Sequence, residues 1–156
     1  FMKKNKFLFL CLLLIAPGVT GCSSEENDNE ITGNNEEESK VTVKLCDVSW
    51  KLYGFGIDSE NIRKAEPSAC STCYLVKFEP DGTFSGQTTS NDFIGIYTTK
   101  NKSFKIVEYG TTKVGEVGDG YKFVEAFCSS FQYEITDKGE LKLYYTQNDF
   151  LLFNPQ

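Results

Sequence analysis

Four cysteines, Cys46, Cys70, Cys73 and Cys128, are the residues whose type and spacing most directly suggest chemistry. An even number of cysteines in an exported domain is typical of a disulfide framework, so we expect two disulfides among them. Three connectivities are open. We favour the one in which Cys46 pairs with one cysteine of the 70–73 segment and Cys128 pairs with the other.

The spacing Cys70-Ser71-Thr72-Cys73 leaves two alternatives open. Zinc sites with four thiolate ligands use this spacing. Redox-active dithiols use it as well, although here no βαβ pattern surrounds it. We predict disulfides and assign no metal ligand and no cofactor.

Catalysis of other kinds finds little support in the composition. The chain contains no histidine, which excludes Ser-His-Asp and Cys-His catalysis and any histidine-ligated metal. Paired carboxylates could support glycoside hydrolysis, and the nearest pairs in sequence are Glu79 with Asp81 and Asp58 with Glu60. Both pairs lie in turn-like or solvated contexts, which predicts ordinary exposed side chains. We therefore predict that the protein is not an enzyme and assign no catalytic residue.

The elements that must position these residues are mostly strands. Short runs of alternating apolar and polar residues recur with turn residues between them, as in the hairpin signal Pro80-Asp81-Gly82. Apolar residues at helical spacing predict one amphipathic helix near 121–130, and a polar stretch around 59–64 suggests a second, short one. The pattern predicts a mostly β fold: a compact, antiparallel, barrel-like and strongly curved sheet of about eight strands.

The inward face of this sheet follows from the alternation. Its many aromatic residues predict an interior filled by side chains rather than a roomy cavity. The predicted inward residues are Trp50, Leu52, Tyr74, Val76, Phe78, Phe104, Ile106, Tyr133, Ile135, Leu141 and Leu143.

The N-terminal part has the pattern of an export signal. Lysines precede a short apolar run, 7–16, which is well below the roughly 20 residues that span a membrane. The segment Val19-Thr20-Gly21-Cys22 resembles a bacterial lipobox, which implies cleavage before Cys22 and lipidation of its sulfur. We therefore expect a cleaved signal peptide at 1–21, a lipidated Cys22 with a tether to residue 40, and a single domain at 41–156.

Acidic residues concentrate in the predicted tether. The whole chain has a formal net charge of −6, and the composition of 23–40 predicts a disordered spacer. This charge excludes nucleic acid as a partner. Acids directly after Cys22 resemble the export signal of Bacteroidetes surface lipoproteins, so we expect an outer-membrane lipoprotein exposed at the cell surface, with a periplasm-facing anchor as the alternative. The acids are Glu25, Glu26, Asp28, Glu30, Glu36, Glu37 and Glu38.

Two segments, 78–86 and 91–97, resemble the META-domain family, which includes the heat-shock protein HslJ. The match joins a strand–Asp-Gly–strand hairpin to an Asn-x-Phe-x-Gly-x-Tyr segment, but Ser90 stands where the family often has a cysteine. The resemblance implies a compact β-barrel-like fold in exported proteins linked to stress tolerance, and no catalytic residues. Its motif residues, for which we predict mostly structural roles, are Trp50, Asp81, Gly82, Gly86, Asn91, Phe93, Gly95 and Tyr97.

These observations favour a non-enzymatic envelope lipoprotein. It would be held at the outer membrane by its lipid and would act through contacts with an envelope or extracellular protein. A lipocalin-like carrier of a small ligand is the alternative, and it requires an open apolar cavity. An envelope hydrolase would require a cleft with two convergent carboxylates.

Overall fold

The computed structural model describes residues 44–58 and 61–156. The predicted signal peptide, the lipidation site Cys22 and the acidic tether lie outside the described residues.

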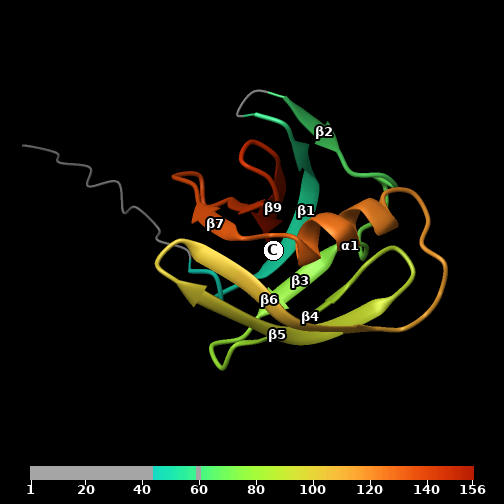
Figure 1. Ribbon diagram of the computed structural model, residues 1–156. Coiled ribbons are helices and arrows are strands. Elements are labelled where there is room, and N and C mark those ends of the chain that lie inside the picture. Colours follow the sequence, from blue (N-terminus) through green and yellow to red (C-terminus); the bar gives the residue numbers. More distant parts are fainter. Residues whose placement is uncertain (1–43, 59–60) are drawn as a thin grey trace, which may run out of the picture. The chain divides into compact units, whose positions relative to one another are not determined.

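Nine strands and one helix make up the described domain (Figure 1). Every strand pairing is antiparallel. The elements are β1 (Ser49–Gly56), β2 (Ile62–Lys64), β3 (Leu75–Phe78), β4 (Thr83–Gln87), β5 (Asp92–Lys100), β6 (Ser103–Thr111), α1 (Gly120–Cys128), β7 (Gln132–Ile135), β8 (Leu141–Tyr144) and β9 (Phe150–Pro155).

Strand β1 closes the sheet into a ring. One edge of β1 pairs with β9 along most of its length, and the other edge pairs first with β3, through Ser49–Lys51, and then with β2, through Gly54–Gly56. The ring therefore runs through β1, β3, β4, β5, β6, β7, β8 and β9, and β2 adds a short flap. The predicted curved, closed, mostly β fold is confirmed.

The prediction of a short helix around 59–64 is wrong where the structure describes this segment. Residues Ile62–Lys64 form strand β2 instead. The physical reason is that β3 pairs only with the first half of β1, so the second half of that edge is left with unpaired backbone groups. Strand β2 satisfies these groups, which outweighs the weak local preference of a polar stretch.

The seam between β6 and β7 is the weakest part of the ring. A single registered pair, Ser103 with Gln132, joins the two strands. Helix α1 contacts both β6 and β9, and Figure 1 shows it lying between β1 and β6. The helix therefore closes the part of the ring that strand pairing leaves open.

Large side chains fill the interior. Their ring contacts include Phe78 with Phe104, whose centroids are 5.6 Å apart, and Phe84 with Phe127 at 5.4 Å. Edge-to-face arrangements of this kind add about 0.5–1.5 kcal/mol per pair beyond burial. The largest fully buried side chains are Trp50, Phe55, Tyr74, Phe78, Phe84, Phe93, Phe104, Phe123, Phe127, Leu141, Phe150 and Phe153.

Helix α1 confirms the predicted amphipathic helix, with one face in the core. Phe123 and Phe127 are buried and stack on each other, with ring centroids 5.6 Å apart. Cys128 and Phe131, which share the same apolar spacing, are exposed. Phe131 lies beyond the end of the helix, so the helical period no longer sets its direction.

The predicted inward residues are largely buried, with three exceptions. Ile106, Tyr133 and Ile135 are only half-buried, although they pack against the core. They belong to β6 and β7, the two strands that meet at the single-pair seam. Fewer neighbours cover them there.

Candidate functional site

Two glycines of the family-like motif allow close approach of aromatic rings. In the β4–β5 register Gly86 lies opposite Phe93, and Gly95 lies opposite Phe84. A Cβ on Gly86 would overlap the Phe93 ring and the carbonyl oxygen of Leu75, and a Cβ on Gly95 would overlap the Phe84 ring and the carbonyl oxygen of Glu108. Each glycine therefore makes room for the ring that faces it. This arrangement accounts for these four positions as packing.

Asp81, Gly82 and Tyr97 stabilise the β3–β4 hairpin. The Asp81 carboxylate accepts hydrogen bonds from the backbone N–H and the hydroxyl of Thr83, at 2.9 and 2.7 Å. Gly82 has φ +87°, which residues with side chains rarely adopt. The Tyr97 hydroxyl donates to the carbonyl oxygen of Glu79 at 2.9 Å, and burial raises the pKa of this tyrosine.

Trp50 and Cys46 connect the start of the domain to its core. The Trp50 indole N–H donates to the carbonyl oxygen of Leu45 at 2.8 Å, and the ring is fully buried. The Cys46 sulfur lies 3.2 Å from the Tyr97 hydroxyl. Trp50 therefore has a structural role here.

Asn91 is the centre of a polar cluster that holds the 112–117 segment. Its side-chain amide donates to the Val114 carbonyl oxygen at 2.7 Å and to a Glu116 carboxylate oxygen at 2.6 Å. Its side-chain oxygen accepts from the Thr112 hydroxyl and the Val114 N–H. All side-chain hydrogen-bonding capacity of Asn91 is used within the chain, so its geometry fits a structural role rather than contact with a ligand.

Glu116 supplies the charge of the same cluster. Its two carboxylate oxygens accept hydrogen bonds from the hydroxyls of Thr88 and Thr89, each at 2.6 Å. Burial alone would raise the pKa of Glu116, but the hydrogen bonds from Thr88, Thr89 and Asn91 outweigh it, so the pKa is lowered. The carboxylate is therefore held in its charged form.

The disulfide pairing that the sequence favoured is wrong. Cys70 and Cys73 bond to each other, with Cα atoms 5.5 Å apart, whereas Cys46 and Cys128 carry free thiols. The bend between the two cysteines brings their Cα atoms within the range a disulfide requires. A site with four cysteine thiolates does not form, because the disulfide takes two of the four sulfurs.

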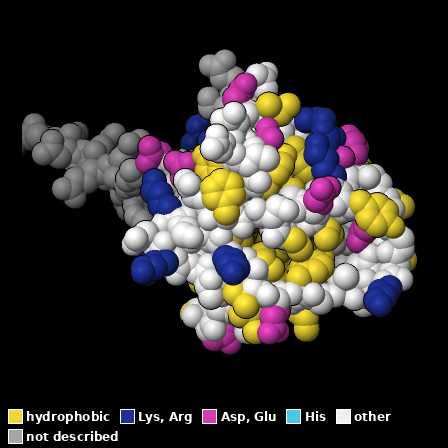
Figure 2. Space-filling model, in the orientation of Figure 1, with side chains coloured by type: hydrophobic (Ala, Val, Ile, Leu, Met, Phe, Trp, Pro, Cys, Tyr) yellow, Lys and Arg dark blue, Asp and Glu magenta, His cyan; other side chains and the backbone are white. Residues whose placement is uncertain are grey.

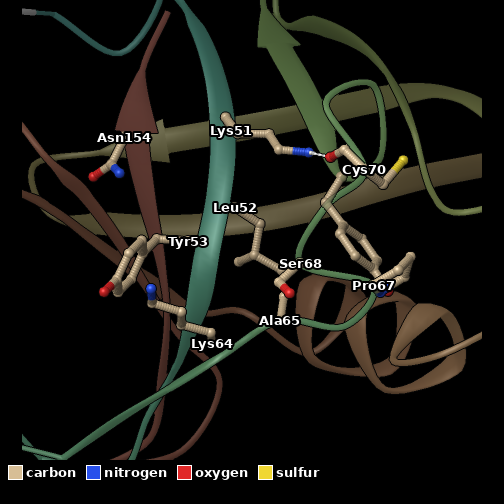
Figure 3. Close-up of a pocket in the computed structure, with 10 residues that line it drawn as sticks. Lys51, Leu52, Tyr53, Lys64, Ala65, Pro67, Ser68, Cys70 and Asn154 are labelled. Atoms are coloured by element: carbon tan, nitrogen blue, oxygen red, sulfur yellow. Dashed lines mark hydrogen bonds between the residues drawn. The ribbon is translucent and has the colours of Figure 1, made fainter.

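A pocket of about 230 Å³ lies beside this disulfide, where β3 and β2 separate along the edge of β1 (Figure 3). Lys51 extends from β1 and donates to the carbonyl oxygens of Cys70, at 2.7 Å, and Cys73. Burial lowers the pKa of Lys51. Lys64, Ser68 and Asn154 also line the pocket.

A second candidate surface lies on the outside of the ring, over β4, β5 and β6. Ile94 is 67% exposed and Ile96 is 39% exposed. The residues opposite them are small or polar: Ser85 and Gly110 face Ile94, and Thr83 and the charged Glu108 face Ile96. A shallow depression of about 570 Å³ forms over these strands. We call these six residues the β4–β6 face.

Figure 2 shows hydrophobic side chains gathered in a hollow between α1 and β6. Half-buried apolar residues of both elements, Ile106, Tyr109 and Val124, pack against the core. The Tyr109 hydroxyl is buried and has no hydrogen-bond partner within 44–58 and 61–156. Burial raises the pKa of the nearby Cys128 thiol.

The carboxylate pairs considered for hydrolysis make ordinary contacts. Glu79 forms an ion pair with Lys77 at 2.9 Å, Asp81 caps its own turn, and Asp58 accepts hydrogen bonds from Asn61. Glu60 lies outside the described residues. Within the described ranges no group of three metal-binding side chains is close enough to hold a metal ion.

Three polar residues that hold segments of the fold were not singled out from the sequence. These are Lys51, Glu116 and Asp119, whose carboxylate binds both guanidinium nitrogens of Arg63 at 2.8 Å. The partners of these three residues are distant in sequence or lie in irregular segments, so no local sequence pattern marks Lys51, Glu116 or Asp119. The described part of the chain has no helix that is long and apolar enough to cross a membrane.

The described domain is thus a small antiparallel ring of strands closed by one helix. Its fold is similar to that of a DUF4847 family protein from Bacteroides vulgatus, with a TM-score of 0.57, 17% identity, and coverage of 72% of this chain and 96% of that one. It is also similar to a protein from Burkholderia xenovorans, with a TM-score of 0.55, 17% identity, and coverage of 72% and 83%. No family model matches the chain, and no curated protein matches it. At this identity the similarity concerns the fold.

Proposed function

We propose that this protein is a lipid-anchored envelope protein that acts through protein contacts, without turning over a substrate. The observation that carries the proposal is the exposed pair of isoleucines, Ile94 and Ile96, on the β4–β6 face. Stress tolerance is the process that the META-like motif suggests. No family model matches the chain, and the suggestion rests on the motif residues themselves.

The anchor is supported by the order of features around Cys22. A basic start, a short apolar run and a lipobox-like segment precede it, and an acidic spacer follows it. Two or three acyl chains at about 0.8 kcal/mol per buried CH₂ would hold the protein at a membrane durably. The folded domain would then work at a short distance from the outer membrane.

The contact role is supported by the side chains of the β4–β6 face. Isolated exposed apolar residues are common, but Ile94 and Ile96 lie on one strand, on the same side, over a depression. Ser85 and Gly110 on the flanking strands leave Ile94 widely accessible, whereas Ile96, which has Glu108 opposite it, is less exposed. Such a face suits an apolar ridge of a protein partner.

The alternative, a carrier of a small ligand, has less support. The ring interior is occupied by the chain's own aromatic side chains, including Phe78 and Phe127 at its centre. A carrier of lipocalin type needs a cavity of at least about 300 Å³ in that position. We therefore do not propose a carrier role.

Labelling of cells with a radioactive or clickable palmitate tests the anchor. The full chain should incorporate the label and fractionate with the outer membrane, and a Cys22→Ser variant should lose both properties. External protease should digest the domain on intact cells. Labelling that persists in the variant would contradict the anchor, and a domain protected until cells are lysed would place it on the periplasmic side.

Crosslinking on intact cells tests the contact role. The full chain should enrich a discrete set of envelope or extracellular proteins over a lipid-anchored control protein that carries the same 1–40 segment. An Ile94→Glu variant should lose these proteins, because a charge on the face would have to be desolvated in the contact. Equal recovery with the wild-type chain and the variant would contradict a role for this face.

A further inference from the structure

We infer that Cys70 and Cys73 form a thiol–disulfide exchange site that reacts through Cys70 with small thiols carrying an anionic group. This inference goes beyond the proposed contact role and does not depend on it. Four features support it: unequal burial of the two cysteines, a hydrogen bond to one sulfur, a neighbouring pocket, and the charge of that pocket.

The two cysteines differ in access. Cys73 is only 5% exposed, whereas Cys70 is half-buried and is followed by the exposed residues Ser71 and Thr72. Exchange begins with attack of a thiolate on one sulfur along an open path. Cys70 offers that path and Cys73 does not. A purely structural disulfide requires no such difference.

The Cys70 sulfur also accepts a hydrogen bond from the backbone. The backbone N–H of Cys73 donates to it at 3.1 Å, and the Thr72 hydroxyl lies 3.8 Å away. A donor aimed at sulfur stabilises a thiolate more than a thiol, which favours a nucleophilic Cys70 in the reduced pair. Cys128 provides a contrast, because burial raises the pKa of its thiol.

The pocket beside Cys70 indicates which thiols the site would take. Lys51 and Lys64 line it together with the polar side chains of Ser68 and Asn154, and its volume of about 230 Å³ suits a small molecule. Figure 3 shows Lys51 pointing at the Cys70 carbonyl oxygen, Lys64 extending toward Tyr53, and the Cys70 sulfur on the side of its residue that faces away from Lys51. Cys70 itself lines the pocket, so a thiol whose carboxylate lies near either of the two ammonium groups would approach Cys70 at the rim.

The exchange consumes two thiols for each protein disulfide. A thiolate RS⁻ attacks the Cys70 sulfur, an R–S–S–Cys70 bond forms, and the bond to Cys73 breaks with the electron pair leaving on the Cys73 sulfur, which takes a proton from water. A second RS⁻ attacks the R sulfur of the mixed disulfide, releasing RSSR and the Cys70 thiolate. The protein disulfide is reduced and the two thiols are oxidised. Reaction of the dithiol with RSSR reverses both steps.

Glutathione, an anionic thiol, is a suitable probe for the full chain in detergent micelles. Defined mixtures of reduced and oxidised glutathione should open and re-form the Cys70–Cys73 bond reversibly, as measured by alkylation and peptide mass mapping. A disulfide that stays closed in excess reduced glutathione would overturn the inference.

Single-cysteine variants identify the reacting sulfur. In Cys73→Ser, oxidised glutathione should modify Cys70 about tenfold faster than Cys128 of the same chain, which serves as the internal reference. In Cys70→Ser, modification of Cys73 should be slower than that of Cys70 in the first variant. Equal or reversed rates in folded chains would overturn the assignment to Cys70.

Thiols of different charge test the pocket. The rate of disulfide opening, relative to neutral 2-mercaptoethanol at equal thiolate concentration, should be raised for glutathione and lowered for cationic cysteamine. Lys64→Gln should reduce this preference severalfold. Lys142→Gln is a matched control, since both lysines lie over aromatic rings and Lys142 lines a different pocket. An unchanged preference in Lys64→Gln would overturn the assignment of anionic thiols, without bearing on the β4–β6 face.

Discussion

At the scale of single residues, the motif positions of this chain are explained by packing and hydrogen bonding. Gly86 and Gly95 admit the rings of Phe93 and Phe84, and Asn91 saturates its hydrogen bonds within the fold. Sequence reasoning singled out Gly86, Asn91, Phe93 and Gly95, but not Phe84. It could not find Glu116, because the contacts of that side chain come from residues more than twenty positions earlier in an irregular loop.

Gly95→Ala should destabilise the domain by about 1–3 kcal/mol, because the new Cβ would overlap the Phe84 ring and the Glu108 carbonyl oxygen and force the sheet or the ring to move. Gly110→Ala is the matched control on the neighbouring strand, where a Cβ would meet nothing closer than 3.9 Å. Urea denaturation of both variants measures the difference. Equal stability of the two variants would show that close packing does not require a glycine at position 95.

Glu116→Gln should lower the free energy of unfolding by about 1–2 kcal/mol at pH 7, because the charged acceptor of three hydrogen bonds is lost. The folded state lowers the pKa of Glu116. Its charged form therefore contributes stability above the unfolded pKa of about 4.3, and this contribution is lost as pH falls through the lower folded pKa.

Urea titrations of the wild type and Glu116→Gln at a series of pH values check this prediction. The stability difference should shrink as the pH falls below about 4. A difference that stays constant down to pH 3 would contradict the pKa shift. Glu125→Gln, at an exposed position of α1, controls for the loss of one negative charge.

At the scale of elements, alternation predicted most strands, and apolar spacing predicted α1. Strand β2 was missed because its pairing depends on the edge of β1 that β3 leaves free, which no local pattern records. The disulfide was missed for a related reason. Spacing alone does not reveal which cysteines approach each other, and the bend at 70–73 brings the sequence neighbours together.

The Arg63–Asp119 pair connects β2 to the start of α1. Asp119 accepts from both guanidinium nitrogens and from the Glu66 N–H, each at 2.8 Å. The hydrogen bonds from Arg63 outweigh burial and lower the pKa of Asp119. Two-point contact of this kind is stronger than an ordinary surface ion pair.

A double-mutant cycle of Arg63→Ala and Asp119→Ala should give a coupling energy of about 1 kcal/mol in urea denaturation. The exposed Lys77–Glu79 pair is the control, for which a cycle should give about 0–0.5 kcal/mol. Coupling of Arg63 to Asp119 no larger than in the control would mean that the contact does not hold β2 to α1.

At the scale of the whole molecule, the side chains that stabilise the fold and the side chains that remain accessible lie in different places. Side chains of the ring interior pack against one another, and those of the Asn91–Glu116 cluster form hydrogen bonds with one another. The outward-facing isoleucines of β5 and the Cys70–Cys73 pocket remain accessible. The sequence predicts the membrane anchor and the architecture, but not the β4–β6 face. The outward direction of Ile94 and Ile96 follows only once the register with β4 and β6 is known.

Photo-crosslinking from a single position tests the proposed contact role most directly. A photoreactive amino acid would replace Ile94 or, as the control, Tyr121, since both side chains are 67% exposed and apolar but lie on β5 and α1. On intact cells carrying the full chain, irradiation should give one discrete adduct from position 94 and none from position 121. Adducts of the same sizes from both positions, or none from position 94, would contradict the β4–β6 face as the contact surface.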